Sequence, residues 1–398
     1  MHKSISLIFI LILFGVYADA QSTITLSPDF VTAAKININR KYTFSKSPLG
    51  SGTLNEFPFV PGKSGFQFKE ERNTAWFEID APVAGQLTFE IRPLEPKDDY
   101  DWMLFKDSKS FRDEIKAGNP SPLRSNNARN DPKTLGKTGL KEGYENLFER
   151  PGPGKSYSKP INIAKGERYY LIIDNIYEGG SGFELQLFLK LDKKNSAVME
   201  GIVKDKTTGF PLNAKIILEE DSTGTFLTEV KTGADGRYTI SAPKGATIYT
   251  TASASGYLFK SSEVKVAGDR VSQDFELDKI STGKKLTLFN IYFSPNKDIV
   301  LPAGDSELER LIKTLKEFPE YNIRIIGHTN NNVFANPKYL QQLSFNRAVS
   351  VKNILVKNGI SEKRISCAGM GGKSPITNSK DPVEGLKNLR VEVVLTKQ

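Results

Sequence analysis

Short apolar and alternating runs, separated by glycine and proline turns, dominate the first half of the chain. Four of them either alternate with a period of two or run apolar, as strands do: 77–79, 86–91, 169–173 and 183–189. This pattern predicts an antiparallel β-sandwich over residues 26–192. The stretch from Lys109 to Ser158 is rich in Asn, Gly, Pro, Lys and Arg, so we expect long loops there.

Strand and turn signals alternate again between residues 197 and 278. Predicted strands are followed by turns that contain Gly, Asp or Pro, as at Thr208–Pro211 and Thr232–Gly236. These residue types suit positions that need a positive or a fixed φ. A second, smaller β-sandwich is therefore expected at 197–278, with linkers predicted at Lys193–Ser196 and Lys279–Lys285.

The last part of the chain changes its period. Tyr321–Ile326 alternates as a strand does. The apolar residues that follow recur with helical spacing and predict a helix buried on one side: Leu340, Leu343, Val351, Ile354 and Leu355. The loop after this strand and the first turns of the helix should bring Thr329, Asn330 and Arg347 towards one another. Such a cluster can hold a small zwitterion, because a guanidinium fork binds a carboxylate.

The N-terminus has the pattern of an export signal. Lys3 gives it a positive start, Ile5–Val16 is an apolar core, and Ala18–Ala20 fits cleavage before Gln21. We therefore expect residues 1–20 to be a signal peptide and the mature protein to be exported. The apolar run is short for a bilayer span. No cysteine follows the cleavage site, so a lipid anchor there is not expected.

Charge and cysteine content narrow the choice of partners. The formal net charge of +9 comes from residues scattered along the chain, with no basic arm and no recognisable nucleic-acid module. Nucleic acid is therefore not the expected partner, and anionic cell-wall glycopeptide or lipid headgroups fit an exported basic protein better. Cys367 is the only cysteine, which excludes an internal disulfide.

Histidine usage argues against an enzyme. Without the predicted signal, His328 is the only histidine. Zinc sites need clusters of His, Cys or carboxylate, and a hydrolytic triad needs a base beside its nucleophile. No Gly-x-Ser-x-Gly elbow is present, and Ala368–Ser374 lacks the glycine spacing of a phosphate loop. We expect a non-catalytic binding protein.

Acidic residues in the first predicted sandwich are the metal candidates. Asp99 and Asp101 flank Tyr100, and Asp174 ends a later apolar run. Calcium takes about six to eight oxygen ligands, often from loops of this kind. These three residues are therefore candidate calcium ligands. The alternative is a solvated acidic turn, because no loop shows a complete ligand spacing.

Several separated motifs in the last part of the chain occur in the order known from one family. They are Leu288–Ser294, Asp305–Phe318, Gly327–Asn330, Leu343–Ala348, Gly359–Ile365, Gly369–Ile376 and Asn388–Val393. Together they resemble the OmpA-like peptidoglycan-binding domain. The resemblance implies that residues 286–398 form a βαβαβ domain with helices on one face of a mixed sheet, and that this domain binds the diaminopimelate of the cell-wall peptide.

The same resemblance implies which residues bind that ligand. They are Thr329, Asn330, Leu343, Ser344 and Arg347. In the family, an Asp after His-Thr and the Arg of Leu-Ser-x-x-Arg-Ala hold the diaminopimelate. This chain departs at the first position, because Asn330 replaces the Asp and offers only a neutral carbonyl oxygen.

The two preceding regions have weaker resemblances. The order of strands and turns at 197–278 resembles the carboxypeptidase regulatory-like domain, and 26–192 loosely resembles sandwich domains of pre-peptidase C-terminal type. The predicted fold is thus multidomain, with two antiparallel β-sandwiches followed by an α/β OmpA-like domain.

The resemblance implies an envelope protein at the periplasmic side of the outer membrane. Such a protein would bind peptidoglycan and reach outer-membrane or periplasmic proteins through the β-sandwiches. Two alternatives stay open. One is a periplasmic scaffold whose C-terminal domain has lost the ligand, and the other is a glycan-binding or enzyme-accessory protein that acts through the first sandwich.

Overall fold

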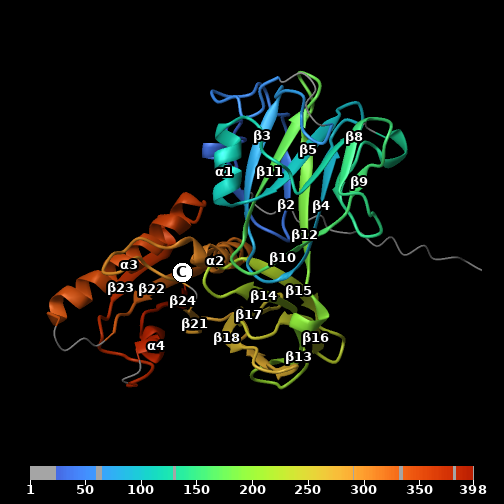
Figure 1. Cartoon of the computed structure of the whole chain (residues 1–398). Coiled ribbons are helices and arrows are strands. Elements are labelled where there is room, and N and C mark those ends of the chain that lie inside the picture. Colours follow the sequence, from blue (N-terminus) through green and yellow to red (C-terminus); the bar gives the residue numbers. More distant parts are fainter. Residues whose placement is uncertain are drawn as a thin grey trace, which may run out of the picture.

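Three units follow one another along the chain in the computed structural model (Figure 1). The structure describes residues 24–59, 65–128, 131–289, 291–330, 335–379 and 382–397. The predicted signal peptide at 1–20 lies outside these ranges. We call the units the first (24–192), the middle (196–278) and the C-terminal unit (285–397). Within the described residues, no helix is long and apolar enough to cross a membrane.

Two six-stranded sheets build the first unit and share one apolar core. One sheet has the order β1-β3-β11-β5-β6-β8, and the other has the order β2-β12-β4-β7-β9 with β10 beside β4. The elements are η1 Phe30–Thr32, β1 Ala34–Ile36, β2 Lys41–Phe44, β3 Thr74–Asp80, β4 Gly85–Pro93, β5 Tyr100–Lys106, α1 Lys109–Lys116, β6 Arg124–Ala128, η2 Pro132–Thr134, β7 Thr138–Leu140, β8 Phe148–Gly152, β9 Tyr157–Ser158, β10 Ile161–Ile163, β11 Arg168–Asn175 and β12 Phe183–Lys190. Side chains from both sheets, among them Phe77, Trp102 and Phe183, are fully buried in the common core.

The prediction of long loops between Lys109 and Ser158 is wrong. This stretch contains α1 and strands β6 to β9. The side chain of Ser108 caps α1 by accepting a hydrogen bond from the Phe111 amide at 3.1 Å. The helix then buries Phe111 and Ile115 against the outer face of the first sheet. This short helix has only one pair of buried apolar residues, so its apolar period is too weak to predict a helix within such a polar stretch.

Strand β6 could not be predicted from its sequence, because its residues are mostly polar although the fold buries them. The Asn126 side chain donates to the Lys155 carbonyl at 2.9 Å, and the Asn127 side chain donates to the Gln67 carbonyl at 3.3 Å. Buried amides are tolerated when they find such partners. Both partners come from loops distant in sequence, so the polar run itself cannot reveal the strand.

The sheets of the first and middle units are not purely antiparallel, which corrects the prediction. Strand β1 runs parallel to β3, β6 to β8, and β7 to β9. In the middle unit, β13 runs parallel to both β19 and β20. Parallel neighbours need a crossover connection instead of a tight turn, and turn signals alone therefore suggested hairpins throughout.

The middle unit consists of two small sheets around a second apolar core. One contains β16, β13, β19 and β20, and the other has the order β15-β14-β17-β18. The elements, with the preceding turn, are η3 Lys193–Asn195, β13 Ser196–Asp205, β14 Lys215–Glu220, β15 Phe226–Lys231, β16 Arg237–Pro243, β17 Thr247–Ser253, β18 Lys260–Lys265, β19 Arg270–Ser272 and β20 Phe275–Leu277. Met199, Ile216 and Phe275 are buried between the sheets.

The C-terminal unit is a mixed sheet with two long helices packed on it. The sheet order is β21-β24-β22-β23, in which β22 and β23 are parallel and β24 is antiparallel to its neighbours. The elements are β21 Lys285–Leu288, η4 Pro302–Gly304, α2 Asp305–Glu317, β22 Tyr321–Gly327, α3 Pro337–Lys357, η5 Glu362–Arg364, β23 Ile365–Gly369, α4 Pro382–Gly385, η6 Leu386–Asn388 and β24 Val391–Lys397. The strand predicted at Tyr321–Ile326 and the helix predicted through Leu355 are confirmed.

The C-terminal unit begins with β21 at Lys285–Leu288, and the rest of the Leu288–Ser294 motif follows this strand. The predicted linker Lys279–Lys285 leads from β20 to β21. It is ordered, since the Ile280 amide donates to the Gly256 carbonyl and the Gly283 amide donates to the Leu395 carbonyl. Backbone hydrogen bonds to both units therefore hold this segment in place.

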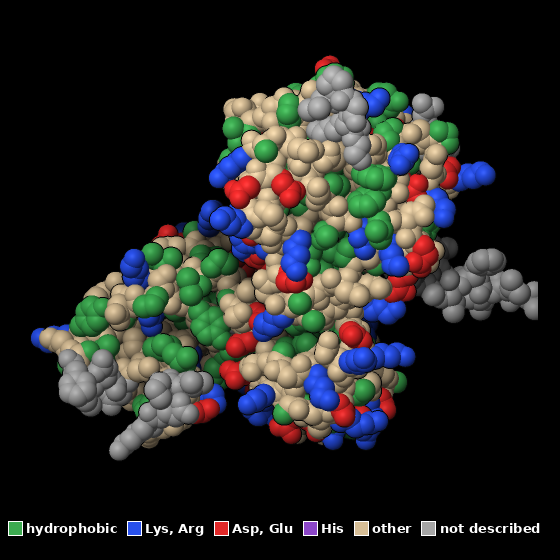
Figure 2. All heavy atoms as spheres, in the orientation of Figure 1, with side chains coloured by type: hydrophobic (Ala, Val, Ile, Leu, Met, Phe, Trp, Pro, Cys, Tyr) green, Lys and Arg blue, Asp and Glu red, His purple; other side chains and the backbone are tan. Residues whose placement is uncertain are grey.

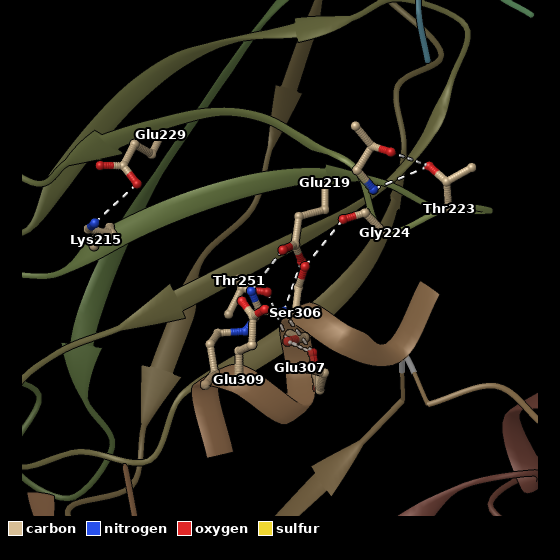
Figure 3. Close-up of polar contacts among 12 residues, drawn as sticks. Lys215, Glu219, Thr223, Gly224, Glu229, Thr251, Ser306, Glu307 and Glu309 are labelled. Atoms are coloured by element: carbon tan, nitrogen blue, oxygen red, sulfur yellow. Dashed lines mark hydrogen bonds and ion pairs between the residues drawn. The ribbon is translucent and has the colours of Figure 1, made fainter. Parts of the chain in front are cut away.

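The middle and C-terminal units share buried apolar and ionic contacts. Leu258 and Phe259 of the middle unit belong to the apolar core of the C-terminal unit. The Arg310 guanidinium on α2 contacts Glu219 of β14 through two N···O distances of 2.8 and 2.9 Å, and it contacts Glu307 at 3.0 Å. Figure 3 shows Glu219 and Glu307 close together where α2 meets the sheet. Both carboxylates are fully buried. These contacts place α2 firmly on the β14–β17–β18 sheet.

Charged side chains of both signs are intermixed over the first and middle units on the face shown in Figure 2. Hydrophobic side chains are more prominent on the C-terminal unit in the same view. The positive net charge therefore does not gather into one stripe on this face.

Candidate functional site

The predicted ligand-binding residues lie at the end of β22 and on the facing turn of α3. The His328 amide donates to the Arg390 carbonyl at 3.0 Å, and the Thr329 amide donates to the Gly371 carbonyl at 2.9 Å. The Gly371 amide in turn donates to the Ser344 hydroxyl at 2.9 Å. The fold thus brings Thr329 and Ser344 together through the loop that follows β23.

Gly327 allows α3 to approach the strand end this closely. A Cβ atom at this position would lie 2.0 Å from the Ser344 carbonyl oxygen, which no side chain can tolerate. Leu343, the residue before Ser344, is half-buried on the same helix. The glycine of the Gly-His-Thr-Asn motif therefore has a packing role, and it sets the distance between the loop and the helix.

Arg347 is buried, with only 5% of its surface exposed. Its Nε donates to the Lys297 carbonyl at 3.1 Å, and the guanidinium carbon lies 4.8 Å from the centre of the Phe293 ring. Burial lowers the pKa of Arg347. The segment before α2 covers this side chain through Phe293 and Lys297.

The remaining nitrogens of Arg347 are still available for a ligand. Among the described residues, neither terminal nitrogen has a hydrogen-bond partner, since only Nε is engaged. With Nε held by the Lys297 carbonyl and the ring of Phe293 against it, the guanidinium plane has a fixed direction. Such a fork is prepared to bind a carboxylate through two parallel hydrogen bonds.

Thr329 and Asn330 carry polar atoms without protein partners in the described part of the chain. The Thr329 hydroxyl and the Asn330 carbonyl oxygen are both enclosed and make no hydrogen bond there. Asn330 lies beside α4, because its Nδ2 is 3.9 Å from the point where a Gly385 Cβ would stand. No described contact joins Arg347 to Thr329 or Asn330. Enclosed polar atoms of this kind are costly unless a ligand or water satisfies them.

A buried charge network that sequence reasoning did not assign lies behind this loop. Arg390 Nε donates to Glu392 Oε1 at 2.9 Å, Lys285 Nζ lies 3.2 Å from the same oxygen, and His328 Nε2 is 3.5 Å from Oε2. Burial opposes the charge of Glu392, but His328 and Arg390 outweigh it and lower its pKa to about 2. Arg390 directly precedes β24 and Glu392 lies on it, and two residues at this spacing point to the same face, which was the available signal.

Arg390 adds a second guanidinium near the loop. Its Nη2 donates to the Ser374 carbonyl at 3.1 Å, while Nη1 is buried and has no partner among the described residues. Glu392 already balances this charge. Arg390 therefore fixes the loop through the Ser374 carbonyl.

The three candidate calcium ligands are buried in the first unit. Asp101 and Asp174 are neighbours across the pairing of β5 and β11. The Asn73 amide donates to Asp174 at 2.8 Å, and Arg72 lies 3.4 Å from it. Burial raises the pKa of Asp101 well above its usual range, and the charge of Asp99 adds to the rise. In the part of the chain that the structure describes, no group of three or more His, Cys, Asp or Glu residues is arranged to hold a metal, and calcium binding stays a prediction.

Comparison with known proteins identifies the class of the C-terminal unit. Residues 292–388 match the OmpA family. The chain is 37% identical over 89 residues to outer membrane protein A of Buchnera aphidicola, an alignment that covers 22% of this chain and 26% of that protein. It is 31% identical over 105 residues to the peptidoglycan-binding protein ArfA of Mycobacterium bovis, covering 26% of this chain and 32% of that protein.

A solved structure, the peptidoglycan-associated lipoprotein from Burkholderia pseudomallei, is 23% identical. The match covers 27% of this chain and 88% of that chain, with a TM-score of 0.25. The chain spans about a quarter to a third of the length of the two curated relatives. The chain thus carries an OmpA-like domain at its C-terminus, and the family match leaves the types of the first and middle units unidentified.

Proposed function

We propose that this chain is a non-catalytic cell-envelope protein that binds peptidoglycan through its C-terminal unit. The observation that carries the proposal is the OmpA-like domain, and it is supported by the held guanidinium of Arg347 and by the unsatisfied oxygens of Thr329 and Asn330 in the same unit. A relative named as a peptidoglycan-binding protein supports the ligand.

The ligand group is the diaminopimelate of the wall peptide, held with the help of Leu343 and Ser344. The free end of diaminopimelate has a carboxylate and an ammonium on one carbon. Arg347 donates charge-assisted hydrogen bonds to the carboxylate, and the Thr329 hydroxyl and the Asn330 carbonyl form hydrogen bonds with neighbouring polar groups of the ligand. The neutral Asn330 makes a weaker contact with an ammonium than an aspartate makes.

The first and middle units link the wall to other proteins. They are proposed as two β-sandwiches, of pre-peptidase C-terminal type and carboxypeptidase regulatory-like type, before a βαβαβ domain. Export by the signal peptide at 1–20 would place them in the periplasm, where they meet outer-membrane or periplasmic partners. OmpA-like relatives that are outer-membrane proteins support this location.

Sedimentation of the full mature chain with isolated cell-wall sacculi tests the proposal. The wild-type protein should pellet, and Arg347→Ala should weaken binding roughly tenfold or more, since a charge-assisted hydrogen bond contributes about 1.5–3 kcal/mol. Arg324→Ala, which replaces an exposed arginine on β22, the strand before Thr329, is the matched control. Because Arg347 is buried, circular dichroism must show that the variant is folded. Unchanged binding by a folded Arg347→Ala protein contradicts the assignment.

The replacement of the family's aspartate by Asn330 favours one second candidate function. A periplasmic scaffold that no longer binds peptidoglycan would also retain the OmpA-like fold. The change Asn330→Asp separates the two, because it converts a neutral hydrogen bond into a charged one and should improve affinity several-fold. A wild-type chain that does not bind, but is rescued by this change, indicates the scaffold. If neither protein binds, the wall-binding proposal fails.

A further inference from the structure

The ammonium of the proposed ligand has no carboxylate partner among Thr329, Asn330 and Arg347. An amino-acid end that gives its carboxylate to Arg347 presents its ammonium within a few ångströms of the same guanidinium. A carboxylate beside Arg347 is the natural acceptor, because an opposite charge is far stronger than a neutral oxygen at such a site. Asn330 cannot supply it.

Asp298 is the carboxylate that the fold places beside Arg347. The Lys297 carbonyl receives the Arg347 Nε at 3.1 Å, and Asp298 is the next residue. Burial lowers the pKa of Arg347, and the charges of Tyr339 and then of Asp298 act in the opposite direction. Asp298 is half-buried, and no hydrogen bond or ion pair engages its side chain among the described residues.

The loop that carries Asp298 is held in place by its own backbone. The Ser294 amide donates to the Ile299 carbonyl at 2.9 Å, and the Lys297 amide donates to the Ser294 carbonyl at 3.0 Å. Phe293 and Val300 form a bridge that closes the loop. Asn296 has a φ of 56°, which such a tight turn requires. An ordered turn therefore carries Asp298 directly after the carbonyl that Arg347 contacts.

Other carboxylates near the site are already neutralised. Glu392 is engaged by Arg390 and Lys285. Glu384, on the short helix next to Asn330, has both oxygens within 2.8 Å of Lys387 Nζ. A ligand ammonium that approached either residue would have to displace an existing cation.

The geometry points to Asp298 as the residue that receives the ligand ammonium, in place of the aspartate that Asn330 has replaced. This inference rests on the proposed function, since it takes diaminopimelate as the ligand and Arg347 as its carboxylate partner. It makes the turn before α2 a specificity determinant: ligands with a carboxylate and an ammonium on one carbon are preferred over otherwise similar carboxylates.

The test uses the full mature chain, isolated sacculi, and two soluble competitors. Free meso-diaminopimelate carries both charges at each end, whereas pimelate has the same chain and carboxylates but no amine. We expect diaminopimelate to displace the wild-type protein from sacculi much better than pimelate does. Asp298→Asn should lower sacculus affinity roughly tenfold and narrow the difference between the competitors, because the charged contact is lost.

A matched control and a rescue sharpen the experiment. Glu320→Gln removes an exposed carboxylate whose charge acts on Arg364 in the same unit, and it should change neither measurement. Adding Asn330→Asp to Asp298→Asn should restore both affinity and amine dependence, because it returns a carboxylate to the other side of the site.

The outcomes separate failure of this inference from failure of the proposed function. Wild-type binding that is lost in Arg347→Ala but unchanged in Asp298→Asn overturns the role of Asp298 and leaves wall binding intact. Weaker binding by Asp298→Asn with unchanged preference for diaminopimelate also overturns it, since the residue would then only orient Arg347. A wild-type chain that never binds sacculi refutes the proposed function itself.

Discussion

Replacing Arg310 should cost more stability than most single changes in this chain. Arg310→Met keeps the length of the side chain and leaves Glu219 and Glu307 buried without their cation. Removing one partner of a buried ion pair costs about 3–5 kcal/mol, because the remaining charge is neither solvated nor paired. Phe259, whose ring centre lies 5.7 Å from the guanidinium, loses its contact as well.

The size of the effect on melting follows from the size of the coupled units. Because α2 joins the middle and C-terminal cores, we expect these two units to unfold together. For a body of this size, 1 kcal/mol shifts the melting temperature by about 2–4 °C, so Arg310→Met should lower that transition by roughly 6–20 °C. Differential scanning calorimetry of the full chain measures it. Lys316→Met, an exposed cation on the same helix, is the control.

The pH dependence of this variant gives a second measurement. Burial raises the pKa of Glu307, and the Arg310 charge opposes that rise. Without Arg310 the folded-state pKa rises further. A carboxyl group whose pKa is raised on folding lowers stability at pH values above its unfolded-state pKa, which is near 4.5. This loss of stability disappears as the pH falls through the folded-state pKa towards the unfolded-state pKa. The deficit of Arg310→Met should therefore shrink on acidification towards that value.

A companion variant tests the reasoning from the other side. Replacing all three groups by Glu219→Gln, Glu307→Gln and Arg310→Met removes the buried charges together and should recover much of the loss. The argument is refuted if Arg310→Met melts with the Lys316→Met control. It is also refuted if the two units give separate transitions that the change does not affect.

Two further predictions concern the first unit. Burial, followed by the charge of Glu56, raises the pKa of Glu71 to about 9, so stability should fall as pH rises from about 4.5 towards 9. Glu71→Gln should make the melting temperature less dependent on pH in this range. Parallel curves of melting temperature against pH for the two proteins would contradict the prediction. If Asp99, Asp101 and Asp174 bind calcium, millimolar calcium should raise the melting temperature of the first unit by mass action, and Asp101→Asn should abolish the rise. A chelator should leave sacculus binding unchanged. If calcium does not raise the melting temperature of the wild-type protein, the proposed calcium site is wrong.

Part of the candidate site was readable from local sequence. The Gly-His-Thr-Asn motif after an alternating run, and Leu-Ser-x-x-Arg-Ala on a helical pattern, predicted β22, the loop and α3. The Thr329–Gly371–Ser344 connection does not follow from that order of elements, because Gly371 comes from the separate loop after β23. The burial of Arg347 does not follow from it either, because its cover comes from the Phe293–Lys297 segment, whose conformation depends on a turn of its own.

The sequence by itself determined the periods of the elements, the order of the three units, and the type of the C-terminal one. Apolar spacing reports which face of a helix or strand is buried, and this is a local property. Only the tertiary structure decided what each buried face meets: that polar strand β6 is satisfied by distant loops, that Arg310 joins two units, and that Asp298 lies beside Arg347. Polar and charged groups become stable in the interior only when specific partners reach them, and those partners are far away in the chain.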